Sequence, residues 1–138
     1  MNTHKVNYRV YYEDTDAGGI VYHARYLHFA ERGRTELLRS VGYENQKLHD
    51  ELGLVFVVRN MDIHFQATSR LDDLLSVETC ITEIKNSSFR MRQQIMRDDQ
   101  NIVGLDVLLV CVSVKDYKPI RMPLEIKEAF LQYQDTLE

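Results

Sequence analysis

The chain has 138 residues, of which 44% are hydrophobic and 28% charged, a composition typical of one globular domain with a sizeable core. Its formal net charge of −4 argues against a nucleic-acid surface as the main partner. No apolar run is long enough to span a bilayer, and the first ten residues contain no apolar signal region, so we expect a cytoplasmic protein.

The N-terminal third predicts one strand followed by one long helix. Residues 8–14 are rich in Tyr and Val and are predicted to form a short strand. From about residue 22 to residue 41 the apolar period becomes that of a helix, and Gly42 is its expected stop. The predicted buried stripe of this helix contains Tyr26, Ala30, Leu37, Leu38 and Val41.

The rest of the chain predicts consecutive strands and a short final helix. Residues 42–53 read as a loop with some helical turns between two glycines. Four segments with strand character follow, at about 60–65, 75–81, 89–95 and 102–114. Pro123 opens a helix whose apolar side holds Ile126, Phe130, Tyr133 and Leu137. This order predicts an α+β domain in which one long helix covers an antiparallel sheet.

One stretch, EDTDAGGIVYH at residues 13–23, concentrates polar chemistry and backbone freedom. Gly18 and Gly19 permit a positive φ and leave room for a ligand, although a simple tight turn would need the same residues. No Ser, Thr, Asn or Asp lies at the expected helix start, so its first N–H groups lack a side-chain cap. Free N–H groups at the positive end of a helix suit an oxygen that gains negative charge.

The acidic residues of this stretch offer a nucleophile or a general base. Asp14 and Asp16 would lie on the same side of an extended strand, and both should be ionised at neutral pH. An Asp in DTDAGG is also typical of a turn or a cap, so the structural interpretation stays open. His23 follows Asp16 by seven residues, where it could bond a carboxylate, orient water or be only half exposed.

Other site chemistries have less support in the sequence. Asp14, Asp16 and His23 are conceivable metal ligands, but no histidine pair has ligand spacing, and we expect no metal and no cofactor. The GxSxG, GxGxxG and P-loop patterns are absent. Cys80 and Cys111 lie in apolar, strand-like contexts, which favours two buried thiols over a disulfide or a metal pair.

The segment YYEDTDAGGIVYHARYLHFAERGRTELL, residues 11–38, resembles the signature of hotdog-fold acyl-CoA thioesterases of the 4-hydroxybenzoyl-CoA thioesterase superfamily. Within this superfamily, the resemblance is closest to the Tol-Pal-associated thioesterase branch. It continues in FVVRNMDIHF, TSRLDD and VLLVCVSV, and so covers nearly the whole chain. The resemblance implies a single hotdog domain over residues 1–138, with a five-stranded antiparallel sheet wrapped around one long helix.

The same resemblance implies roles for individual residues. Asp16 matches the catalytic carboxylate, and the backbone N–H at His23, directly after Tyr22, matches the group that polarises the thioester carbonyl. In the Tol-Pal-associated branch the histidine side chain is also thought to assist. Asp14 is then a structural residue of the turn, and Gly19 gives the substrate oxygen room.

More loosely, the resemblance places Lys85, in KNSSF, where related enzymes contact the coenzyme A nucleotide from the neighbouring subunit; an ordinary solvated lysine is the alternative. Since one helix leaves sheet edges uncovered, we expect a homo-oligomer, as a dimer of dimers.

The expected function is hydrolysis of acyl-CoA thioesters to a free acid and coenzyme A. Asp16 would act as the nucleophile, through a mixed anhydride, or as the base that activates water. A non-catalytic module that binds an acyl group or an acyl carrier protein is the main alternative, although such a module needs no carboxylate at this position. A hydratase is a further alternative function, but hydratases of this fold usually pair a histidine with an Asp or Glu in a different helix context.

Overall fold

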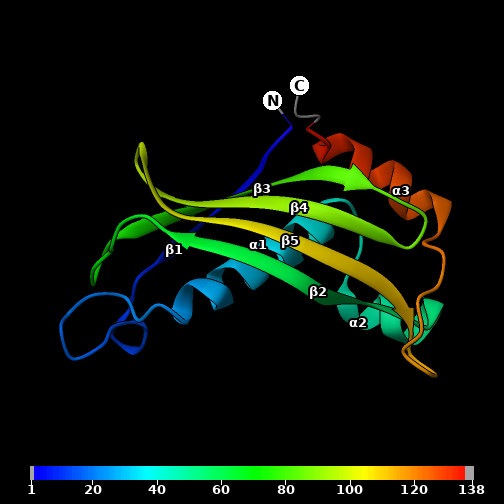
Figure 1. The fold of residues 1–138 in the computed structure, drawn as a ribbon, viewed down its shortest axis with the longest axis horizontal. Helices are drawn as coiled ribbons and strands as arrows, with labels where there is room; N and C mark the ends of the chain where they lie inside the picture. The colour runs from blue at the N-terminus through cyan, green and yellow to red at the C-terminus, as the bar shows by residue number, and fades with distance from the viewer. Residues whose placement is uncertain (1, 136–138) are drawn as a thin grey trace.

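The computed structural model describes residues 2–135 (Figure 1), and its elements follow the predicted order of strand, long helix, four strands and short helix. The strands and helices are β1 (His4–Arg9), η1 (Tyr12–Asp14), α1 (Arg25–Ser40), α2 (Asn45–Lys47), η2 (Leu48–Leu52), β2 (Leu54–Phe65), β3 (Leu74–Ile84), β4 (Ser88–Arg97), β5 (Gln100–Ser113), α3 (Leu124–Phe130) and η3 (Leu131–Tyr133).

The five strands form one antiparallel sheet in the order β1-β3-β4-β5-β2. β3, β4 and β5 are joined by short turns and lie in the middle, while β1 and β2 form the two edges. Figure 1 shows α1 lying along one face of this sheet, where it contacts β1, β3 and β4. The α+β prediction with one long helix on the sheet is confirmed.

Two residues explain how closely α1 approaches the sheet. A Cβ at Gly33 would lie 2.5 Å from Cγ1 of Val77, so only glycine permits this contact. Gln93 of β4 is fully buried, and its Nε2 donates to the carbonyl oxygen of Ala30 at 2.9 Å and to Oγ1 of Thr79 at 3.0 Å. This buried amide therefore fixes α1 on β3 and β4 with satisfied hydrogen bonds.

The predicted strand over residues 8–14 is wrong. β1 ends at Arg9, and Tyr12–Asp14 form a turn of 3₁₀ helix instead. The cause is local, because Oδ2 of Asp14 accepts the backbone N–H of Tyr11 at 2.8 Å and so closes a turn that an extended strand could not make. As a result, Asp14 and Asp16 do not share a strand face.

The helix boundaries also shift. α1 begins at Arg25 rather than near residue 22, because residues 22–24 form a turn in which Arg25 N–H donates to the Tyr22 carbonyl oxygen at 2.8 Å. Val41 is the C-cap just beyond the helix, and Gly42 adopts a φ of 96°, as expected of a residue that ends a helix.

The buried side of the last helix is confirmed for Ile126 and Phe130, while Leu137 lies outside the described residues. Cys80 and Cys111 are both buried and unpaired with each other, as predicted, and burial raises the pKa of the Cys111 thiol to about 11. Within residues 2–135, every helix is too short or too polar to cross a membrane.

Candidate active site

The loop between η1 and α1 is a small hairpin. Thr15 pairs with Val21, the Asp16 N–H donates to the Ile20 carbonyl oxygen at 2.9 Å, and the Gly19 N–H donates back to the Asp16 carbonyl oxygen at 3.0 Å. Gly19 has a φ of 84°, which explains why glycine occupies that position. The hairpin holds Asp16 in an exposed position just before the helix start.

Asp14 is buried and serves the architecture of this loop. Its Oδ1 accepts Nε of Arg25 at 2.9 Å and lies 2.8 Å from Nη2 of the same guanidinium. Its backbone carbonyl oxygen accepts the N–H of Tyr22 at 2.9 Å. With both carboxylate oxygens engaged, Asp14 ties η1 to the first residue of α1, as a structural residue of the turn would.

Asp16 has the opposite environment. It is exposed, and its Oδ1 accepts the Gly18 N–H at 2.8 Å. Among residues 2–135, its second carboxylate oxygen has no hydrogen-bond donor within range. Asp16 can therefore serve both as a turn residue and as a reactive carboxylate, because Oδ1 orients the group through the Gly18 N–H and the second oxygen is free to react.

The start of α1 presents free backbone donors. Val21 N–H donates to the Ser69 carbonyl oxygen at 2.9 Å, and the Tyr22 N–H is taken by Asp14. In the described part of the chain, the N–H groups of His23 and Ala24 have no acceptor, and Ala24 provides no side-chain cap. The predicted uncapped helix start is therefore confirmed. α1 is 16 residues long, so its positive end reinforces these donors.

Aromatic rings flank the helix start. The exposed His23 ring lies 4.6 Å from the Tyr22 ring and 6.0 Å from the Phe65 ring, measured between centroids. Phe65, at the end of β2, is 50% exposed, and its ring is also 6.2 Å from that of Tyr26. Sequence reasoning gave Phe65 no role at the site, although an aromatic residue at the end of an alternating strand was a usable signal.

The segment at residues 67–73 supports the hairpin from its other side. Ile20 pairs with Arg70, and the buried Tyr26 hydroxyl lies 2.6 Å from Oγ of Ser69. Burial raises the pKa of Tyr26, and its hydrogen bond with Ser69 opposes that shift. The support that this segment gives to the hairpin could not be predicted from a local pattern, because the Tyr26–Ser69 and Ile20–Arg70 contacts span 43 and 50 residues.

Lys85 is not brought to this site within one chain. It is exposed in the turn between β3 and β4, with Nζ 3.6 Å from Oε1 of Glu83. β3 begins with Leu74, which pairs with Arg9 near the hairpin, and runs 11 residues to its other end, about 33 Å away (Figure 1). Within one chain, Lys85 and the Asp16 hairpin therefore lie towards opposite ends of β3.

Comparison with known proteins gives a consistent result. The model of the thioesterase-like superfamily matches residues 10–130. The chain is 48% identical to the acyl-CoA thioesterase YbgC of Haemophilus influenzae, over 88% of this chain and 90% of that protein. It is 44% identical to the acyl-CoA thioester hydrolase YbgC of Escherichia coli, over 90% and 92% of the two chains.

Solved structures agree. A probable thioesterase from Bartonella henselae is 40% identical, with a TM-score of 0.84 over 88% of this chain and 99% of that one. A 4-hydroxybenzoyl CoA thioesterase variant in complex with 4-hydroxybenzoyl CoA superposes with a TM-score of 0.88 over 94% and 99% of the two chains. At 22% identity the second match shows the fold alone. The predicted hotdog arrangement of sheet and helix is confirmed.

Proposed function

This chain belongs to the thioesterase-like superfamily and hydrolyses acyl-CoA thioesters, and from that premise we propose that Asp16 delivers the oxygen nucleophile while the helix start at His23 stabilises the oxyanion. One observation carries the assignment. A hairpin holds an exposed carboxylate with one free oxygen, and the chain that leads from this hairpin into α1 presents two backbone N–H groups that have no acceptor in residues 2–135.

The chemistry of a thioester suits these groups. The leaving thiolate has a conjugate acid with a pKa near ~8.5, so its departure needs little help from an acid. What remains is attack on the carbonyl carbon and stabilisation of the tetrahedral oxyanion. A backbone donor in an oxyanion hole contributes roughly 3–4 kcal/mol to transition-state stabilisation. We assign that donor to the His23 N–H, which has no acceptor within residues 2–135, and its ring packs on that of Tyr22.

Two routes use Asp16. As a nucleophile, its oxygen bonds to the acyl carbon, the thiolate leaves, and water then hydrolyses the mixed anhydride. As a base, it takes a proton from the water that attacks the acyl carbon directly. Many turnovers in ¹⁸O-labelled water, followed by mass spectrometry of the protein, test the anhydride route, because water that attacks the Asp16 carboxyl carbon of the anhydride leaves the label in Asp16. The base route never labels Asp16, so a labelled Asp16 establishes the anhydride.

The remaining site residues support binding in this proposal. Gly19 lies within the Asp16 hairpin, where a Cβ would meet no atom within 4 Å, so the space beside it is open to a substrate. Tyr22 is 48% exposed next to His23, where it can cover the substrate. Lys85 contacts the nucleotide of a coenzyme A bound by a neighbouring subunit. Its exposed position at the far end of β3 is compatible with that role.

We further propose a homo-oligomer, assembled as a dimer of dimers. β2 is an edge strand, and three of its apolar side chains, Val57, Val58 and Phe65, are 38%, 46% and 50% exposed. An edge of this length and apolar character favours association with another copy.

We add four finer assignments to this proposal. We place the enzyme in the Tol-Pal-associated branch and in the cytoplasm, where buried thiols such as Cys80 stay reduced. We assign residues 1–138 to one domain, in keeping with the match over residues 10–130. Acyl carrier protein is the alternative carrier of the acyl group.

The test is a panel of acyl-CoA and acyl carrier protein thioesters, with thiol release measured for the parent enzyme and for Asp16→Asn. Hydrolysis by the parent and its loss in the variant supports the assignment. Binding of thioesters without hydrolysis by either protein would instead favour a non-catalytic acyl-binding module.

A further inference from the structure

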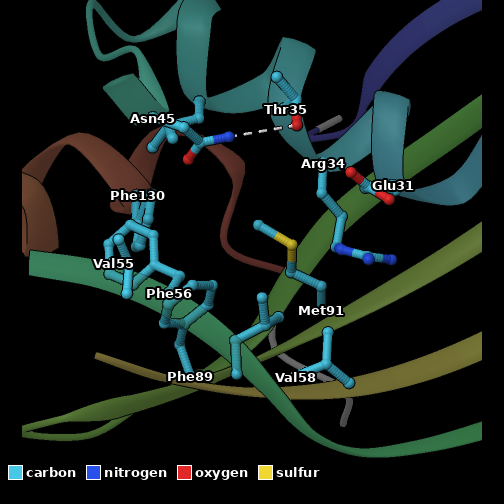
Figure 2. A pocket seen from close by; sticks show the side chains of 12 residues that line it. Glu31, Arg34, Thr35, Asn45, Val55, Phe56, Val58, Phe89, Met91 and Phe130 are labelled. Carbon is cyan, nitrogen blue, oxygen red and sulfur yellow. Dashed lines mark hydrogen bonds between the residues drawn. The ribbon is translucent and has the colours of Figure 1, made fainter. Parts of the chain in front are cut away.

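A pocket of about 360 Å³ lies between α1 and the sheet, and none of the residues that line it belongs to the hairpin of Asp16 (Figure 2). Its volume is within the range of small-molecule sites. Phe56, Phe89 and Phe130 form an aromatic wall, with ring centroids 4.8–6.1 Å apart. Met91, two residues after Phe89 on the same strand β4, also lines the pocket. This part of the pocket suits an apolar ligand body.

The helix side of the pocket carries a cation. Figure 2 shows the Arg34 side chain reaching from α1 towards Met91 and Val58. Nη1 of Arg34 donates to Oε1 of Gln93 at 3.0 Å. Gln93 is itself fully buried and fixed by bonds to two other residues, so the guanidinium rests on a rigid partner.

This guanidinium has spare bonding capacity. It has five N–H donors, and within residues 2–135 only the bond to Gln93 uses one. No carboxylate of the described chain lies within 4.0 Å of it, although Glu31 stands one helical turn away. Burial lowers the pKa of Arg34, with Glu31 opposing the shift, so its surroundings disfavour the charged form. An anion in the pocket would offset that penalty.

We propose that this pocket binds a carboxylate that carries an apolar body, with the carboxylate on the free N–H groups of Arg34 and the body against the aromatic wall. A carboxylate matches the fork of a guanidinium and accepts two parallel hydrogen bonds from it. Thr35 and Asn45 line the pocket beside Arg34 as neutral polar groups, whereas Glu31 brings a negative charge to the same lining. The carboxylate of the ligand is therefore placed on the side of the guanidinium that faces away from Glu31.

The carboxylate has two possible sources. In the first case, it is the far end of an acyl group whose thioester the enzyme hydrolyses, and this case rests on the proposed function. In the second case, it belongs to a free carboxylic acid, such as the product. Binding of a free acid requires no hydrolysis.

The first experiment is calorimetric titration with octanoate and with 1-octanol, which share an apolar chain and differ in charge. Octanoate should bind the parent protein, and Arg34→Gln should weaken it at least ~10-fold, as for loss of a charge-assisted pair. Arg32→Gln, an exposed arginine on the same helix, is the matched control and should leave octanoate binding unchanged. Should Arg34→Gln unfold, the parent's preference for octanoate over 1-octanol still tests the charge requirement.

The second experiment identifies the source. It compares kcat/KM for octanoyl-CoA with that for the acyl-CoA that bears a carboxylate at its far end. If the acyl group is the source, the parent prefers the carboxylated substrate, and Arg34→Gln lowers that preference ~10-fold while Arg32→Gln does not. If a free acid is the source, octanoate binding depends on Arg34 and the two substrates show no Arg34-dependent difference.

The proposal is overturned if the parent does not bind octanoate, if it binds octanoate no better than 1-octanol, or if a folded Arg34→Gln variant binds octanoate as tightly as the parent. Its failure is separate from that of the proposed catalysis. Asp16→Asn should abolish hydrolysis but should still bind octanoate. If Asp16→Asn binds octanoate and also remains an active hydrolase, the catalytic role of Asp16 is contradicted and the pocket proposal is not.

Discussion

The buried carboxylate of Asp14 and the guanidinium of Arg25 form an ion pair, with Oδ1 and Nη2 2.8 Å apart, that joins η1 to the first residue of α1. The Asp14 side chain is only 5% exposed and that of Arg25 is 23% exposed. Because the hairpin of Asp16 spans the chain between these two residues, the pair fixes the geometry of the site.

Asp14→Asn should therefore destabilise the fold by about 2 kcal/mol, since it leaves a partly buried Arg25 without its counter-charge. Glu13→Gln, at the exposed neighbouring position, should change stability by less than about 0.5 kcal/mol. Urea unfolding of the three proteins measures the difference. Equal midpoints for both variants would show that the ion pair does not hold the loop.

Asp16→Asn should reduce kcat at least ~10²-fold with little change in KM, because it removes the charge needed for attack or for proton abstraction. Stability should hardly change, since the asparagine oxygen still accepts the Gly18 N–H. Asp98→Asn, an exposed turn residue with a positive φ of 52°, is the control. Near-parental thiol release by Asp16→Asn would mean that another group is the nucleophile or base.

The oxyanion assignment gives the main role to the backbone N–H of His23 rather than to its side chain, and two substitutions test these groups independently. His23→Ala keeps the N–H and should lower kcat by less than ~10-fold, whereas His23→Pro removes the donor and should cost ~10²–10³-fold. Ala24→Pro tests the neighbouring N–H at a φ of −67°, which proline accepts. Circular dichroism establishes that each variant folds. If His23→Pro and His23→Ala are equally active, the His23 N–H is not the oxyanion donor.

Stability should fall as the pH drops below 6.5, in part because of His4. Burial lowers the pKa of His4 from 6.5, with Glu36 opposing, and its Nδ1 is buried without a partner in residues 2–135. The unfolded chain therefore binds more protons between the lowered pKa and 6.5, so the free energy of unfolding decreases there on acidification. His4→Gln should flatten that slope in urea titrations, while the exposed His28→Gln should not.

Light scattering should show a particle larger than one chain at micromolar concentration, because β2 exposes an apolar edge. Val57→Lys, which charges that edge, should shift the mass downwards and reduce activity if the Lys85 contact crosses subunits. Glu51→Lys, exposed in the preceding helix, controls for added charge. A fully active monomeric parent would contradict both the oligomer and the shared nucleotide contact.

Much of the architecture is encoded in short-range patterns. The alternation that ends at Phe65 and the helical stripe that includes Ala30 and Leu37 depend only on residues a few positions apart, so the order of strands and helix was predictable. The glycine stop at Gly42 and the uncapped start of α1 are also local features, determined by residue type at a helix end.

Only the tertiary structure distinguishes the role of Asp14 from that of Asp16. Both acids belong to the tripeptide DTD, and composition alone treats them alike. Folding buries one against Arg25, eleven residues later in the chain, and leaves the other on an exposed hairpin. Phe65 comes beside His23, and Arg34 comes to rest on Gln93, through contacts that span 42 and 59 residues. Such contacts depend on which strands pair and how the helix crosses them, information that no local pattern contains.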